Sequence, residues 1–202
     1  MITTVSLIRH GESVWNASRR WQGFAPVPLN EVGFAQAAEA GEILRHAGVH
    51  RIISSDLLRT RQTADTINTI LQVPIEHDAR LREINVGSWQ GLTLDEIMQW
   101  DPVNYQIFHD APAPQRSFPN GESYTQLSER MSQVIREAVQ QHPGEHLLLV
   151  SHGGSIRAAV IGLIGKHIEQ SVHNCSITRL TFQDEWSLLD FACTPASVKW
   201  QF

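Results

Sequence analysis

Short apolar runs alternate along the chain with longer segments in which apolar residues recur every three or four positions. The short runs are too brief for a helix and end in polar or glycine-containing turns, so they predict buried strands. The longer segments have the spacing of helices with one buried face. The predicted strands cover residues 5–8, 52–55 and 147–150, and the predicted helices cover residues 30–48, 57–74, 124–138 and 155–164.

Local signals mark the ends of several of these elements and add shorter ones. Asn30 is a helix-capping residue at the start of its segment, and Pro74 ends the helix that follows the second strand. Thr93 with Glu96 matches a capping box for a short helix through Trp100. The remaining patterns predict a loop or lid at 111–121, a glycine-rich turn at 151–154, and a hairpin formed by residues 177–182 and 186–191.

The alternation of strands and helices indicates an α/β fold with a mostly parallel sheet. In such sheets, ligands bind beyond the carboxyl ends of the strands. The length of 202 residues fits a single compact domain. With 42% hydrophobic and 18% charged residues, the chain resembles globular proteins that fold without disulfides or a structural metal.

Composition and charge exclude several classes of protein. The formal net charge of −5 argues against a nucleic-acid-binding surface, which is normally basic. The longest apolar run, at 158–165, is far shorter than the roughly 20 residues needed to cross a bilayer. Arg9 interrupts the N-terminal apolar run too early for a signal peptide, and Cys175 and Cys193 are too few for a disulfide framework. We therefore expect a reduced, cytoplasmic protein with no nucleic-acid or membrane partner.

Two strand ends carry the same pattern of residues. Leu7-Ile8-Arg9-His10-Gly11 and Leu149-Val150-Ser151-His152-Gly153 each consist of an apolar strand, a polar residue and then His-Gly. Glycine at such a point lets the backbone approach a ligand closely. Arg59 lies in the first turns of the next helix, near its positive end, whereas Arg61 is expected to face elsewhere. Glu83 follows near another presumed strand end.

These side chains together suit phosphoryl transfer. A neutral imidazole can attack phosphorus, arginine forks match phosphate oxygens, and a carboxylic acid can protonate the leaving oxygen. Water then cleaves the phosphohistidine, so one difficult step is replaced by two easier ones. In this interpretation Glu83 carries a proton when the substrate binds.

The motifs resemble those of the histidine phosphatase superfamily, the phosphoglycerate-mutase-like proteins. The matching stretches, in the family's order, are residues 7–16, 22–23, 28–29, 54–64, 81–83 and 151–154. They span nearly the whole chain, which makes coincidence very improbable. The resemblance implies a three-layer α/β/α sandwich with a small helical cap, in which residues 1–202 form one catalytic domain and the cap covers about residues 92–122.

The resemblance also implies a role for each matching position. His10 would be the phosphorylated nucleophile, and Glu83 would be the proton donor. The phosphoryl group would be bound by Arg9, Arg59 and His152. Positions that contact phosphate or substrate in relatives correspond to Asn16, Gln22, Gly23 and Gly153. Family members need no metal or organic cofactor, so we expect none, and the expected partner is a small-molecule phosphate ester. Members occur as monomers and dimers, which leaves a homodimer open.

The segment after Glu83 favours the phosphatase branch of this family. Mutases follow the glutamate with His-Tyr-Gly and carry longer insertions, whereas here Glu83 is followed by Ile84-Asn85-Val86-Gly87 in a short chain. We therefore predict a metal-independent phosphomonoesterase, with a cofactor-dependent phosphoglycerate mutase as the alternative. A non-catalytic phosphate-binding module ranks below both because the catalytic set is complete. Pro26 departs from the acidic residue of many relatives, so their substrate preferences do not carry over at this loop.

Several residues with reactive or bulky side chains have a structural interpretation instead. Trp15 and Trp21 flank the site in sequence and are expected at its rim. The aromatic residues of the cap segment either line a substrate lid or pack within the cap: Trp100, Tyr105, Phe108 and Phe118. Surface positions are predicted for six further histidines, namely His46, His50, His77, His142, His146 and His167.

Overall fold

The computed structural model describes residues 1–112, 115–166, 168 and 170–200 of the chain. Within these residues, strands form one six-stranded sheet in the order β3-β2-β4-β1-β5-β6. The strands β3, β2, β4 and β1 run parallel, and β5 and β6 are antiparallel to their neighbours. This confirms the mostly parallel sheet and its final hairpin. The strands are β1 (Thr3–Arg9), β2 (Arg51–Ser54), β3 (Ile75–His77), β4 (His146–Ser151), β5 (Ile177–Phe182) and β6 (Trp186–Cys193).

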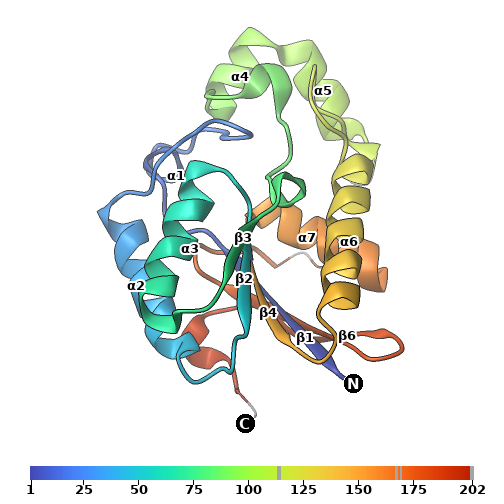
Figure 1. The fold of residues 1–202 in the computed structure, drawn as a ribbon. Helices are drawn as coiled ribbons and strands as arrows, with labels where there is room; N and C mark the ends of the chain where they lie inside the picture. The colour runs from blue at the N-terminus through green and yellow to red at the C-terminus, as the bar shows by residue number, and fades with distance from the viewer. Residues whose placement is uncertain (113–114, 167, 169, 201–202) are drawn as a thin grey trace.

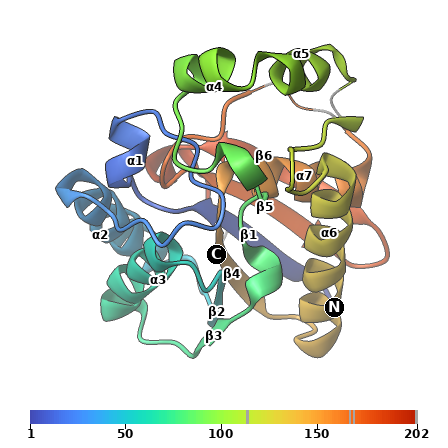
Figure 2. The ribbon, with the colours of Figure 1, turned by 90° about the horizontal axis from the view of Figure 1, so that it is seen from above.

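Helices cover both faces of the sheet, as Figures 1 and 2 show. Successive residues of a strand point to opposite faces. Val5 and Leu7 therefore join the apolar cluster under α6 (Tyr124–Gln141) and α7 (Gly153–Ile164), whereas Ile8 joins the cluster under the other helix pair. That pair consists of α2 (Glu31–Leu44) and α3 (Leu58–Leu71). The predicted three-layer α/β/α sandwich is thereby confirmed.

Two short helices lie over one end of the sheet and form the cap (Figure 1). The first, α4 (Leu94–Trp100), begins at the predicted capping box. The second, α5 (Pro102–Asp110), was not predicted from the apolar pattern; it begins with a proline, whose fixed φ suits a first helical position. The remaining short elements are α1 (Val14–Ala17), η1 (Ala79–Leu81), η2 (Gly87–Trp89) and η4 (Pro195–Ser197).

Aromatic side chains pack the cap onto the body of the protein. Trp89 is fully buried, and its ring meets Phe108 and Phe118 with centroids 5.3 and 5.6 Å apart. Tyr105 packs against the same cluster, whereas Trp100 is 63% exposed. Of the two alternatives, the structure supports packing for Tyr105, Phe108 and Phe118, and it leaves Trp100 largely exposed. In the predicted 111–121 loop, residues 113 and 114 lie outside the described residues.

Two sequence predictions are corrected by the structure. The last major helix begins at Gly153 rather than at Ser155, so the predicted glycine-rich turn ends at its N-cap, His152. His146, predicted at the surface, is only 8% exposed. It opens a strand covered by both helical layers, and its ring nitrogens are satisfied by Ser6 Oγ and the Ala47 carbonyl, both at 2.8 Å.

For the other histidines predicted at the surface and for the two cysteines, the structure agrees better with the prediction from sequence. His46, His50 and His77 are exposed and His142 is partly buried, whereas His167 lies outside the described residues. Both cysteines are free thiols. In the described part of the chain, no helix is long and apolar enough to span a membrane.

Candidate active site

The register of the sheet brings the two His-Gly motifs together. In the parallel pair β1 and β4, Arg9 lies opposite Ser151, so the residues that follow leave the sheet side by side. The His10 amide donates to the Ser151 carbonyl at 3.0 Å. The ring centroids of His10 and His152 are 5.2 Å apart in an edge-to-face arrangement. Two histidines separated by most of the chain therefore share one site at the carboxyl ends of the strands.

The contacts of His10 fix which ring nitrogen faces a substrate. Its Nδ1 lies 2.7 Å from the Gly11 carbonyl, which can only accept, so Nδ1 carries the hydrogen. Nε2 is thereby left without a hydrogen, and its lone pair accepts a hydrogen bond from Arg59 Nε at 3.3 Å. Burial, together with the charges of Arg59 and Arg9, holds the pKa of His10 well below 6.5. The imidazole is consequently neutral at physiological pH.

Arg59 is held by the backbone of the loop opposite it. The side chain is 1% exposed, and its terminal nitrogens donate to the carbonyls of Ala25 at 3.1 Å and Gly23 at 2.9 Å. Burial lowers its pKa to about 10, which leaves it positive at neutral pH. Pro26, the departure from the family pattern, is exposed on this loop. Because carbonyl groups hold Arg59, the departure does not remove its support.

Arg9 supplies the second guanidinium of the site. One terminal nitrogen donates to the Val172 carbonyl at 2.7 Å, which fixes the side chain toward the loop before β5. Its Nε is buried without a hydrogen-bond partner among the described residues. Burial lowers the pKa of Arg9, and the nearby carboxylate of Glu83 opposes this shift. A buried donor with no partner is a group that an incoming anion can satisfy.

Glu83 is docked on the N-terminus of α7. The Gly154 amide donates to Oε2 at 3.1 Å, the Ile84 amide donates to Oε1 at 2.9 Å, and Ser155 Oγ lies 3.2 Å from Oε1. The early start of α7 makes this possible, because the first amides of a helix have no partner within it. A Cβ atom on Gly154 would lie 2.6 Å from Oε1. Glycine is thus required for the carboxylate to come this close.

A cavity of about 390 Å³ lies among these groups. Seven of the predicted site residues line it, namely Arg9, His10, Gln22, Gly23, Arg59, Glu83 and Gly153. The other lining residues are Trp21, Ile84, Val86, Tyr124, Gly154, Arg157, Ser171 and Val172. The structure therefore assembles most of the set chosen from sequence around one cavity. Trp21 lines it as expected, whereas Trp15, also expected at the rim, is not among the lining residues.

Two predicted residues, His152 and Asn16, are not among the lining residues. His152 is fully buried beside His10, its Nε2 is 3.0 Å from Ser55 Oγ, and its Nδ1 has no partner among the described residues. Burial and the charge of Arg59 hold its pKa well below 6.5. Asn16 instead closes a capping box with Ser13 on α1. The substrate roles of both residues remain predictions.

Sequence reasoning missed several residues that line the cavity. Arg157 lies four residues after Gly153 and so on the same face of α7, a spacing that could have revealed it. Tyr124 is the first residue of α6, and burial together with the charge of Glu83 raises the pKa of its hydroxyl. Ser171 and Val172 belong to the connection before β5 and follow no periodic pattern. Among the described residues, no group of three or more His, Cys, Asp or Glu side chains could hold a metal ion.

Comparison with known proteins identifies the family. A family model described as the histidine phosphatase superfamily (branch 1) matches residues 5–194. The chain belongs to this superfamily. Among curated proteins it is 36% identical over 188 residues to "Probable phosphoglycerate mutase GpmB" of Yersinia pestis (strain Pestoides F), a match that covers 89% of this chain and 85% of the relative.

Solved structures of similar proteins share the whole fold. YhfR of Bacillus stearothermophilus superposes with a TM-score of 0.88 at 30% identity, covering 95% of this chain and 98% of the other. A mycobacterial glucosyl-3-phosphoglycerate phosphatase in complex with VO3 superposes with a TM-score of 0.86 at 28% identity, covering 95% of this chain and 99% of the other. A mutant phosphoserine phosphatase of Entamoeba histolytica in complex with phosphoserine superposes with a TM-score of 0.83 at 27% identity, covering 94% of this chain and 96% of the other.

Proposed function

We propose that this member of the histidine phosphatase superfamily is a metal-independent phosphomonoesterase that acts on a small phosphorylated metabolite through a phosphohistidine. One observation carries the proposal: a neutral imidazole, held with its Nε2 unprotonated, shares a cavity with two arginines and a carboxyl group. These are the nucleophile, the charge-stabilising donors and the proton donor that phosphoryl transfer requires.

In the first step, His10 Nε2 forms a bond to phosphorus while the bond from phosphorus to the ester oxygen breaks. Glu83 gives its proton to that leaving oxygen, so an alcohol departs rather than an alkoxide. Arg59 then donates to the phosphoryl oxygens instead of to Nε2, and Arg9 Nε gains the partner that it lacks. The hydrogen on Nδ1 stays in place because the Gly11 carbonyl accepts it.

In the second step, water attacks phosphorus and the phosphorus–nitrogen bond breaks. Glu83, now ionised, takes a proton from the attacking water and returns to its starting form. Inorganic phosphate leaves, and His10 is again neutral. The unpartnered Nδ1 of the buried His152 supports a role beside the phosphoryl group in both steps.

The central test is hydrolysis of p-nitrophenyl phosphate in the presence of EDTA. We expect activity to persist with the chelator and His10→Ala to abolish it, because the nucleophile is lost. Quenching during turnover with denaturant at alkaline pH, where a phosphorus–nitrogen bond survives, should trap an acid-labile phosphate on the wild-type chain. The exposed His46 provides the matched control, since His46→Ala leaves the site intact. Activity that vanishes with EDTA or survives His10→Ala would contradict the mechanism, and binding of phosphate without turnover would indicate a non-catalytic phosphate-binding module.

The role of Glu83 is tested by the dependence of the rate on the leaving group. We expect Glu83→Gln to reduce kcat/KM about 10²–10⁴-fold for phenyl phosphate, which needs a proton on its leaving oxygen, and much less for p-nitrophenyl phosphate. The measurement is the ratio of the two kcat/KM values in wild type and variant. Equal losses on both substrates would show that Glu83 does not act as the acid.

A cofactor-dependent phosphoglycerate mutase is the second candidate, because the curated relatives carry that name. A mutase must keep water out and hold its product for a second phosphorylation, whereas a phosphatase admits water. The short segment after Glu83 supports the phosphatase, as do two of the similar solved structures, which are named phosphatases. Incubation with 3-phosphoglycerate and 2,3-bisphosphoglycerate should yield phosphate and no 2-phosphoglycerate. Formation of 2-phosphoglycerate would favour the mutase.

A further inference from the structure

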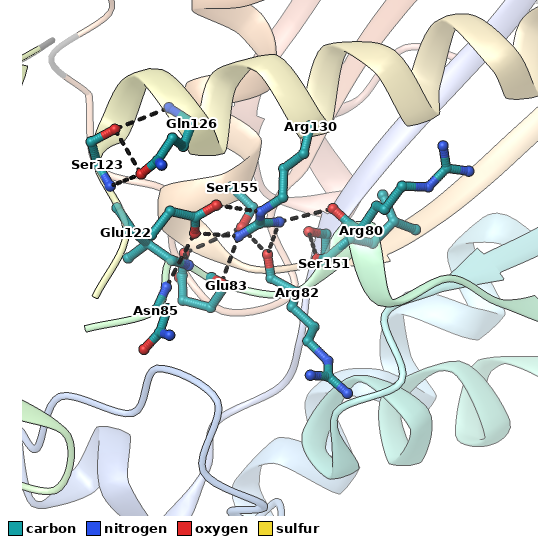
Figure 3. Close-up of polar contacts among 12 residues, drawn as sticks. Arg80, Arg82, Glu83, Asn85, Glu122, Ser123, Gln126, Arg130, Ser151 and Ser155 are labelled. Atoms are coloured by element: carbon teal, nitrogen blue, oxygen red, sulfur yellow. Dashed lines mark hydrogen bonds and ion pairs between the residues drawn. The ribbon is translucent and has the colours of Figure 1, made fainter. Parts of the chain in front are cut away.

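Arg130 on α6 uses its whole guanidinium to hold the segment that carries Glu83 (Figure 3). One terminal nitrogen donates to the carbonyls of Arg80 at 2.8 Å and Arg82 at 2.7 Å. The other donates to the Glu83 carbonyl at 2.8 Å and to Glu122 Oε2 at 2.8 Å. Nε donates to Glu122 Oε1 at 2.7 Å. Every one of the five N–H donors of an arginine is thereby used.

These contacts fix the backbone on both sides of Glu83. The Arg82 carbonyl belongs to the peptide plane that precedes the Cα of Glu83, and the Glu83 carbonyl belongs to the peptide plane that follows it. With both planes held, only the side-chain torsions of Glu83 remain free. The amides of Gly154 and Ile84 then set those torsions at the carboxylate. The direction in which the carboxyl group points is therefore determined by Arg130 and α7 together.

Glu122 extends the same network to the root of the cap. Its side chain is 14% exposed and pairs with Arg130, while its Oε2 accepts from the Asn85 amide at 3.2 Å. Its own amide donates to the Asn85 carbonyl at 2.8 Å. Both cap helices, α4 and α5, lie between Asn85 and Glu122 in the chain. The pair thus ties both ends of the cap segment to α6.

We propose that Arg130, paired with Glu122, is a positioning residue that aims the Glu83 carboxyl group at the leaving oxygen, an inference that rests on the proposed phosphatase function. Arg130 is absent from the described residues that line the cavity, so it acts through the Glu83 segment and not on the substrate. Lysine cannot replace it, because an ammonium group has three donors at one point and cannot serve three carbonyls and a carboxylate.

The decisive experiment compares p-nitrophenyl phosphate with phenyl phosphate in Arg130→Lys and Glu122→Gln. The two substrates share an aryl phosphate group but differ in their need for a proton on the leaving oxygen. We expect Arg130→Lys to lower kcat/KM for phenyl phosphate at least about tenfold more than for p-nitrophenyl phosphate. Arg136→Lys, an exposed arginine on the same helix, is the matched control and should leave both values within about twofold, the range expected of a surface substitution.

A double-mutant cycle separates positioning from general destabilisation. If Arg130 acts through Glu83, then adding Arg130→Lys to Glu83→Gln should cause no further difference between the two substrates. Thermal unfolding of each variant identifies any that fails to fold, in which case Glu122→Gln, which keeps the shape of the side chain, carries the comparison. Equal losses on both substrates, or a differential loss that persists in the Glu83→Gln background, would overturn the role of Arg130. If the wild type shows no hydrolysis that depends on His10, the proposed function itself would be overturned.

Discussion

At the scale of single residues, the reactivity of the site depends on a few backbone groups. The Gly11 carbonyl selects the tautomer of His10, and the carbonyls of Gly23 and Ala25 hold Arg59 against it. The Gly154 amide holds Glu83. Main-chain groups are available whatever the side chain, which explains how the loop around the exposed Pro26 still supports the site.

Gly154 offers a sharp test at this scale. In Gly154→Ala the new methyl group would lie 2.6 Å from Glu83 Oε1, so the carboxyl group has to move off the helix terminus. A displacement of about 1 Å in such a group can cost about 100-fold in rate, and we expect a loss of that order in kcat for phenyl phosphate. Gly48→Ala is the control for lost stability: that glycine lies in the loop after α2 with open space around it but a φ of +66°, so alanine strains the backbone away from the site. Unchanged kcat in Gly154→Ala would argue against the assigned position of Glu83.

At the scale of elements, the two ends of β4 perform different tasks. Its carboxyl end leads into His152 and the N-terminus of α7, which together form one wall of the site. Its first residue, His146, links β1 and the turn after α2 instead. Nδ1 donates to the Ala47 carbonyl, and Nε2 accepts from the Ser6 hydroxyl. The same strand thus borders the candidate site at one end and supports packing at the other.

Replacement of His146 should therefore affect stability and not activity. His146→Phe keeps an aromatic ring but leaves the Ala47 carbonyl and the Ser6 hydroxyl without their partner, which costs about 2–4 kcal/mol in the free energy of unfolding. Urea unfolding measures the loss, and kcat/KM of the folded variant should match the wild type. His46→Phe, at an exposed position, is the comparison. A loss below about 0.5 kcal/mol, typical of a surface position, would contradict the structural role.

At the scale of the whole molecule, charge is distributed unevenly. The chain carries a net charge of −5, yet Arg9 and Arg59 converge on one cavity. Local focusing of this kind can attract a small anion to an acidic protein. The net charge of −5 therefore gives no argument against a phosphate ester as the ligand. The convergence of Arg9 and Arg59 on one cavity supports the expectation that a single phosphoryl group is bound.

Three buried histidines make the stability of the molecule depend on pH. Burial is the largest cause of the lowered pKa of His10, His146 and His152 in the folded chain. Below about pH 6.5 the unfolded chain therefore binds more protons than the folded one. The free energy of unfolding should fall as the pH falls through this range, by up to about 1.4 kcal/mol per pH unit for each histidine. Urea unfolding at pH 7.5 and 5.5 measures the slope; equal stability at both values would contradict the burial of neutral imidazoles.

The layered α/β fold follows from the sequence, and seven of the nine site residues predicted from it line the cavity. Strand and helix periodicity are local properties, and the His-Gly motifs stand at predicted strand ends, so topology alone brings them to one edge. The start of α7, the burial of His146 and the contacts of Arg130 could be learned only after folding. Arg130 reaches the Glu83 carbonyl across 47 residues of sequence, and His146 reaches Ser6 across 140. Such contacts depend on which backbone groups lie within about 3 Å after folding, and no spacing along the chain encodes that.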